Sequence, residues 1–182
     1  MEGLNGLFPI PLYYNKVEIK DIKIPKFEDS NVVRNINQEL KDKVFSVISE
    51  MIQELGYIDQ PLKLNDMWFN CYNEDRPLLE YHFHQNCSWT GTYYPEDANH
   101  VMVLYNPHAN LIQSHYPTVV TPTGFNQEVI HASDIKKGQL IIHPSWMAHQ
   151  VFWNGGEPSH SISFDVGYEL PIGDTEYGSY SE

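Results

Sequence analysis

A series of short strand-like segments, separated by turn residues, most constrains how this chain can fold. After Gly56, apolar and polar residues alternate in segments of four to eight residues, the pattern of side chains along a β-strand. Clusters such as Asn73–Pro77 and Asn154–Gly156 supply turns between the segments. The expected strands are Met67–Tyr72, Leu78–His84, Gly91–Tyr94, Val101–Tyr105, Gln139–His143, His149–Trp153 and Ser159–Val166. Many short strands of this kind predict a β-sandwich or barrel.

One helix is expected before these strands, over about residues 37–55. Its apolar residues recur at helical spacing and are Val44, Ile48, Met51, Ile52 and Leu55. Asp29–Asn31 supplies residues that favour the start of a helix. The apolar stripe should pack against a sheet. Residues 7–24 are predicted to form two further short strands around Asn15–Lys16.

The composition is that of one globular domain spanning residues 1–182. Hydrophobic residues make up 41% of the chain and charged residues 19%, which does not fit a disordered protein. From Gly173 onward the sequence is polar and rich in Gly, Ser and Tyr. We therefore expect residues 173–182 to form a partly disordered tail.

Charge and hydropathy narrow the possible partners and the compartment. The formal net charge of -13 argues against a nucleic acid or an anionic membrane surface as the main partner. No apolar run approaches the roughly 18 residues of a membrane span. The N-terminus has no basic region before its short apolar stretch, so no signal peptide is expected. With only Cys71 and Cys87 as thiols, we expect a cytoplasmic protein with reduced cysteines.

Three histidines form the candidate metal site. His82 and His84 are two residues apart on an expected strand, so their side chains point to the same side of it. His149 begins a later expected strand, within the segment His143-Pro-Ser-Trp-Met-Ala-His149. Neutral imidazoles bind iron or zinc through one ring nitrogen. A polar strand face is often only the solvated face, but two histidines on one face together with His149 indicate a non-haem iron centre. His143 is a candidate to support this site from behind.

Five segments of the chain, in order, resemble one known family. The resemblance is to the small 2-oxoglutarate/Fe(II)-dependent oxygenases of bacteria and phages, which have a double-stranded β-helix fold. The matching segments are Leu7–Tyr13, Trp68–Asn70 followed by His82–His84, Ser88–Tyr94, Gly138–His149 and Ser161–Asp165. They fall in order across nearly the whole chain, so the resemblance is specific.

The resemblance implies a fold, a metal and a co-substrate. The fold would be a mainly β jelly-roll, or cupin-like, barrel with one N-terminal helix buttressing its larger sheet. His82, His84 and His149 would bind Fe(II). The residues implied to bind 2-oxoglutarate are Trp68, Asn70, Tyr93, Ser159 and Ser161. The metal and the co-substrate would then carry the oxidation, while the protein would position the substrate and control access.

Two positions differ from the family pattern. His84 stands where the superfamily at large has a carboxylate, so either three histidines form the site or Glu80 or Asp97 completes it. Ser159 stands where the family has an arginine that binds the distal carboxylate of 2-oxoglutarate. Without that arginine the co-substrate loses charge-assisted hydrogen bonds worth roughly 1.5–3 kcal/mol each. Candidates to replace it are Ser161, Tyr93 and Lys137.

Three functions are therefore compared. The first is a 2-oxoglutarate-dependent hydroxylase, a dioxygenase whose prime substrate the sequence does not identify. The second is a three-histidine, cupin-like metalloenzyme that does not use 2-oxoglutarate. The third is an inactive jelly-roll protein with a binding or structural role. The tryptophans suit a groove for a small molecule or peptide as well as they suit a core, and exposed strand edges are compatible with a homodimer.

Overall fold

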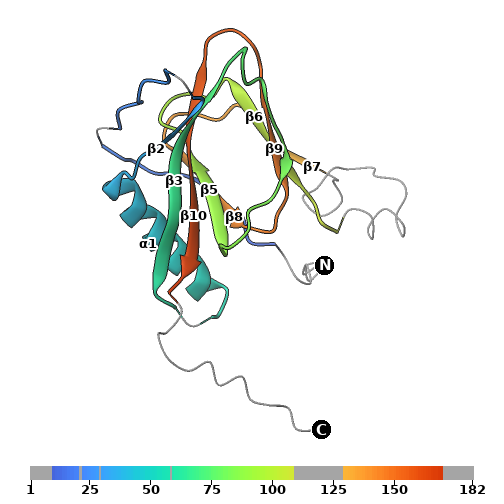
Figure 1. The fold of residues 1–182 in the computed structure, drawn as a ribbon. Helices are drawn as coiled ribbons and strands as arrows, with labels where there is room; N and C mark the ends of the chain where they lie inside the picture. The colour runs from blue at the N-terminus through green and yellow to red at the C-terminus, as the bar shows by residue number, and fades with distance from the viewer. Residues whose placement is uncertain (1–9, 21, 29, 58, 109–128, 170–182) are drawn as a thin grey trace.

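A computed structural model describes residues 10–20, 22–28, 30–57, 59–108 and 129–169. The elements are β1 (Tyr13–Lys16), β2 (Val32–Arg34), α1 (Gln38–Glu54), β3 (Leu62–Tyr72), β4 (Leu78–His82), β5 (Trp89–Tyr93), β6 (His100–Tyr105), β7 (Val129–Ala132), β8 (Gln139–Pro144), β9 (His149–Trp153) and β10 (Ser159–Tyr168). One antiparallel sheet has the strand order β1-β8-β5-β10-β3-β2, and the other has the order β4-β9-β6-β7. Figure 1 shows the two sheets facing each other, with α1 on the outer side of the larger one.

The helix begins one residue after its N-cap. The Asn37 side chain accepts a hydrogen bond from the Leu40 backbone N–H at 2.8 Å, which satisfies one of the free donors of the first turn. The expected helix over 37–55 is confirmed to within a residue at each end. Asp29–Asn31, however, is not the cap: Ser30 and Asn31 precede β2, a short strand that the sequence reading missed.

The N-terminal part differs from the prediction of two strands. A single strand, β1, contains Asn15 and Lys16, which were expected to separate two strands. No strand is assigned over the described part of residues 17–24, although the Val17 N–H still donates to Gly138 O at 2.8 Å. Strand β3 also starts five residues earlier than expected, and β7 was not anticipated. Short edge strands such as β2 and β7 have few residues in which alternation could be recognised.

The large sheet has an apolar outer face and a polar inner face. On β10, Ile162 and Phe164 are completely buried against α1 residues such as Leu40 and Ile48. A Cβ atom on Gly91 of the neighbouring β5 would lie only 2.6 Å from the Phe164 ring, so glycine lets the two strands pack closely here. A second apolar cluster, which includes Tyr94, Met102 and Leu104, lies in the interior. The two-sheet arrangement with one helix agrees with the expected fold class.

Two further expectations concern membrane-spanning segments and the C-terminal tail. Among the described residues, no helix is both long enough and apolar enough to cross a membrane. The tail expected over residues 173–182 lies outside the described residues.

Candidate metal centre

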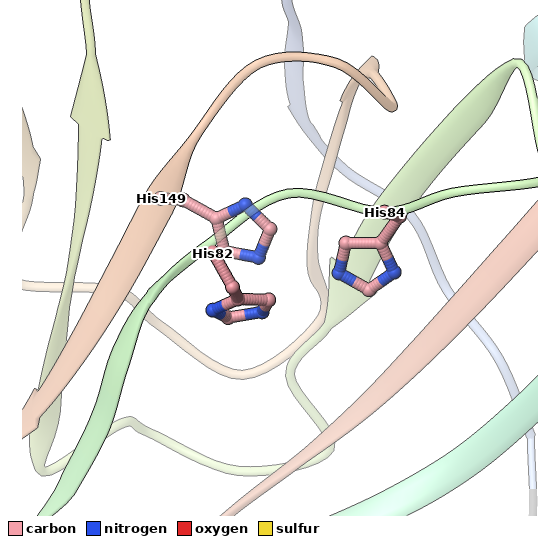
Figure 2. Close-up of side chains that lie close together, drawn as sticks. All are labelled: His82, His84 and His149. Carbon is pink, nitrogen blue, oxygen red and sulfur yellow. The ribbon is translucent and has the colours of Figure 1, made fainter.

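The three histidines of the candidate site meet between β4 and β9. His82, the last residue of β4, is paired in register with His149, the first residue of β9. His84 follows two residues later, where its backbone N–H donates to Ser145 O at 2.9 Å. One possible ligand atom from each of the three rings lies within 4.8 Å of the others. Figure 2 shows the three rings gathered from these two segments. A single metal ion can therefore be reached by all three side chains.

All three rings have an oxygen beside Nδ1. Nδ1 of His82 lies 2.6 Å from Glu80 O, and Nδ1 of His149 lies 3.3 Å from Met147 O. Nδ1 of His84 lies 2.7 Å from Oδ1 of Asp165. An oxygen acceptor at Nδ1 favours the tautomer that carries its proton there, which leaves the lone pair of Nε2 for a metal. The surroundings of the three rings thus select the nitrogen that would bind the ion.

Burial favours the neutral form of His82 and His149. Burial, together with the neighbouring rings of His143, His82 and His84, lowers the pKa of His149 to about 2. Burial also lowers the pKa of His82. His143 packs against His149 with ring centroids 5.0 Å apart, and burial lowers its pKa to about 4. Since only the neutral imidazole is a ligand, His82 and His149 are in the protonation state that can bind a metal at neutral pH.

A β-bulge decides which side chains of β4 face inward. Strict alternation predicts that Leu79, Tyr81 and Phe83 share the face opposite to the histidines. The register of β4 against β9 instead shifts between Leu79 and His82. Leu79 consequently lines the same cavity as His82, whereas Tyr81 and Phe83 are 60% and 51% exposed. The predicted side for the histidines is retained, but the prediction for Leu79 is wrong because a bulge interrupts the two-residue period.

The two carboxylates considered as replacement ligands do not join the centre. Glu80 is exposed. Asp97 lies beside Lys136, with a carboxylate oxygen 3.6 Å from Nζ, and accepts from the Lys137 N–H at 2.9 Å. The group of mutually close ligand atoms contains only histidines among the described residues. Three histidines are therefore the ligand set that the geometry offers.

Asp165 is the carboxylate that the structure places next to the centre. Its Oδ1 is buried and makes no hydrogen bond of good geometry among the described residues, although Nδ1 of His84 is at ion-pair distance. A carboxylate behind a metal-binding histidine orients the ring and raises its basicity. Asp165 can thereby supply, through His84, the negative charge that a carboxylate ligand would have supplied directly. The sequence reading assigned Asp165 only to a matching motif, because its partner is far away in the chain.

The histidines stand on the wall of a cavity of about 330 Å³ between the sheets. Its polar lining residues include Trp68, Asn70, Thr92, Ser163, Asp165 and both arginines of the chain, Arg34 and Arg76. Asn70 donates to Ser163 Oγ at 3.0 Å, so part of this lining is already hydrogen-bonded. A cavity of this size with convergent polar groups is typical of a site for a small ligand.

The residues expected to bind 2-oxoglutarate fall into three places. Trp68 and Asn70 line the cavity. Ser161 is buried on the inner face of β10, opposite Asn70 in register. Ser159 is also buried, but its hydroxyl accepts from the Asn99 N–H at 2.8 Å and lies 2.8 Å from Nδ1 of His100. Tyr93 belongs to the core between the large sheet and α1.

Arg76 is the cavity residue that sequence reasoning missed. It lies in the turn after β3, and nothing in the local sequence shows where such a side chain points. The presence of only two arginines in an acidic chain was the one available signal.

Comparison with known proteins supports the same fold. At 13% identity, the alpha ketoglutarate dependent epimerase SnoN from nogalamycin biosynthesis matches over 83% of this chain and 70% of its own, with a TM-score of 0.53. AviO1 from Streptomyces viridochromogenes Tue57 matches at 11% identity over 88% and 75%, with a TM-score of 0.50. An oxidoreductase of the 2OG-Fe(II) oxygenase family from Burkholderia pseudomallei matches at 9% identity over 75% and 65%, with a TM-score of 0.49.

The likenesses to SnoN and AviO1 show a shared fold and confirm the expected double-stranded β-helix. The search of curated proteins gives no match. The sequence model of the family described as "Putative 2OG-Fe(II) oxygenase" matches residues 66–165, more than half of the chain and the part that holds the three histidines. The chain belongs to this 2OG-Fe(II) oxygenase family, whose metal and co-substrate, Fe(II) and 2-oxoglutarate, are those expected from the sequence.

Proposed function

We propose that this protein is a 2-oxoglutarate-dependent Fe(II) dioxygenase that hydroxylates a small molecule or peptide. The observation that carries the proposal is the convergence of three imidazoles, each with an oxygen beside Nδ1, on the wall of a cavity of about 330 Å³. His82, His84 and His149 are the proposed ligands. When bound, Fe(II) and 2-oxoglutarate supply the oxidising chemistry.

The donor set fits iron. Three imidazole nitrogens leave coordination positions free for a bidentate co-substrate and for oxygen, as non-haem iron enzymes require. Three neutral ligands provide less negative charge than two histidines and a carboxylate. Asp165, beside His84, offsets this difference without occupying a coordination position.

Buried oxygens without partners also favour a ligand in the interior. The hydroxyls of Tyr94 and Ser161 are buried and have no hydrogen-bond partner among the described residues, and the buried Oδ1 of Asp165 has only the His84 ring at ion-pair distance. Such groups are costly in a folded protein unless something else satisfies them. Ser161 and Asp165 are on the inner face of β10, the strand whose Ser163 lines the cavity. A polar co-substrate and its bound water are suitable partners.

The proposal is tested by anaerobic titration of the protein with Fe(II), followed by 2-oxoglutarate. We expect one Fe(II) per chain and then a weak visible charge-transfer band when the 2-oxo acid chelates the metal. Glutarate is the matched control, because it has the same carbon chain and both carboxylates but no 2-oxo group, and it should give no band. Absence of Fe(II) binding would contradict the metal assignment and the enzymatic function together.

A second candidate is a three-histidine metalloenzyme that does not use 2-oxoglutarate. The observation in its favour is Ser159, which provides no positive charge at the family's arginine position. Its buried hydroxyl contacts Asn99 and His100. Stoichiometric Fe(II) binding without the charge-transfer band would favour this candidate over the first. Product analysis after aerobic turnover would then show whether a substrate is hydroxylated or changed in another way.

A further inference from the structure

We propose that Arg76 binds the distal carboxylate of 2-oxoglutarate, in place of a cation on β10. This inference rests on the proposed function. It concerns the cavity that the three histidines also line, and it assigns the co-substrate anchor to the turn between β3 and β4. If the 2-oxo acid end of the co-substrate chelates the metal, its second carboxylate lies further along the five-carbon chain and needs a positively charged partner.

The position on β10 supplies no charge. Ser159 is neutral, and its hydroxyl is already engaged with the Asn99 N–H and with His100. His100 is buried between the rings of Tyr72 and Tyr94, and burial lowers its pKa to about 4. Neither Ser159 nor His100 is therefore a cation at neutral pH.

Two arginines, Arg34 and Arg76, line the cavity, and they differ in whether a carboxylate of the protein already pairs with them. Nε of Arg34 lies 2.9 Å from a carboxylate oxygen of Asp66, and the Arg34 side chain is 76% exposed. Arg76 forms no ion pair with any described carboxylate. Arg76 thus keeps its charge available to a ligand, whereas the charge of Arg34 is already neutralised by Asp66 at the surface.

The guanidinium of Arg76 is held by one of its three nitrogens. Nη1 donates to Asn31 O at 3.2 Å and to Oδ1 of Asn70 at 3.3 Å. Cζ lies 5.5 Å from the centroid of the Tyr72 ring, within range of a cation–π contact. Nε and Nη2 make no hydrogen bond to the described residues. An arginine fixed at Nη1 with its other N–H groups free is prepared for a bidentate carboxylate.

The backbone of Arg76 is fixed as well. The side chain of Asn73 accepts from the N–H groups of Asp75 and Arg76, each at 3.1 Å, and Asn73 and Arg76 form a β-bridge. The Asn70 amide then links Arg76 to Ser163 on β10. All three side chains of this link line the cavity that contains His82, His84 and His149. One cavity therefore has a metal-binding group of histidines and a fixed arginine on its walls.

The experiment compares two ligands that differ only at the distal carboxylate. 2-Oxopentanoate has the same 2-oxo acid end and chain length as 2-oxoglutarate, but it ends in a methyl group. Dissociation constants for both are measured anaerobically on the Fe(II)-loaded protein, by calorimetry or by fluorescence of Trp68 and the other tryptophans. In the native protein we expect 2-oxoglutarate to bind about 10- to 100-fold more tightly, the effect of one to two charge-assisted hydrogen bonds.

Arg76→Gln should remove most of this preference while 2-oxopentanoate binds as it does to the native protein. Arg76→Lys keeps the positive charge but loses the planar guanidinium that can donate two parallel hydrogen bonds, and it should retain part of the preference. Arg34→Gln, the same change at the other arginine, should retain it fully. If Arg76 had only a structural role, Arg76→Gln would weaken the binding of both ligands equally. Unchanged binding of 2-oxopentanoate shows that the variant is folded.

The outcomes separate this inference from the proposed function. If the native protein binds neither 2-oxo acid, the proposed function fails and the inference fails with it. If the native protein binds 2-oxoglutarate preferentially and Arg76→Gln preserves that preference, only the assignment to Arg76 is overturned. If Arg34→Gln instead loses the preference for 2-oxoglutarate, Arg34 binds the distal carboxylate and the assignment to Arg76 is likewise overturned.

Discussion

The two faces of β10 differ in chemistry: the outer face is apolar and the inner face is polar. On the outer face, Ile162 and Phe164 are completely buried against α1, in a cluster made only of apolar and aromatic groups. On the inner face, the buried hydroxyl of Ser161 has no hydrogen-bond partner among the described residues, and the carboxylate of Asp165 lies beside the His84 ring. Because side chains alternate along a strand, adjacent residues of one strand can serve stability and ligand binding separately. The contrast between the faces can be tested by substitutions at each.

The largest effect is expected at the inner site, from His149→Ala. This change removes one of the three proposed ligands, and we expect no measurable binding of Fe(II) in an anaerobic competition with a chromophoric chelator. His131, which is exposed on β7, gives the matched control, since His131→Ala should bind one Fe(II) per chain. Stoichiometric iron retained by His149→Ala would show that the centre lies elsewhere.

A substitution on the outer face should lower stability and leave Fe(II) binding nearly unchanged. Phe164→Ala deletes a completely buried ring between Gly91 and the helix, and we expect it to reduce the free energy of unfolding by about 3–5 kcal/mol. Denaturant unfolding of the metal-free protein measures this loss. Fe(II) affinity of the fraction that remains folded should change little. A stability loss below about 1 kcal/mol would mean that this face is not the main source of stability.

The two faces also differ in how far the sequence predicted them. The alternation on β10 and the helical spacing that ends near Leu55 were enough to predict the outer core, because apolar periodicity reports burial directly. The His82, His84 and His149 group was predicted from their positions on strands. The inner face depended on features without a local signal: a bulge that turned Leu79 inward, and a turn that directs Arg76 into the cavity. Such features follow from tertiary packing.

A smaller effect at the inner face is expected from Asp165→Asn. Losing the charge beside His84 should weaken Fe(II) binding about 10- to 100-fold, as for other partners behind metal-binding histidines. Stability of the metal-free protein should stay the same or rise, because a negative charge is removed from a largely buried position while the amide oxygen can still lie beside the His84 ring. Asp66→Asn at the cavity rim is the matched control and should leave Fe(II) affinity unchanged. Lower stability with unchanged metal affinity would give Asp165 a structural role instead.

The smallest effect concerns pH and His100, a buried imidazole on the interior side. Burial, aided by the electrostatic effect of the His160 side chain, lowers the pKa of His100 to about 4 from 6.5. Above pH 6.5 both the folded and the unfolded states are neutral at this residue. Between pH 6.5 and about 4 the unfolded state takes up a proton that the folded state does not, so the free energy of unfolding falls with decreasing pH, by up to about 1.4 kcal/mol per pH unit from this residue.

His100→Gln should therefore make the pH dependence of stability less steep by about that amount. Urea unfolding of the metal-free protein at several pH values between 4 and 7 measures the slope for the native chain and the variant. His131→Gln, the same change at an exposed position, should keep the slope of the native chain. Phe164→Ala should shift the whole curve downward with its slope unchanged, because the titratable groups in the described core cluster around Phe164 are tyrosines, which do not titrate between pH 4 and 7. An unchanged slope in His100→Gln would show that the interior histidine does not couple folding to protonation, and the faces would then differ in packing alone.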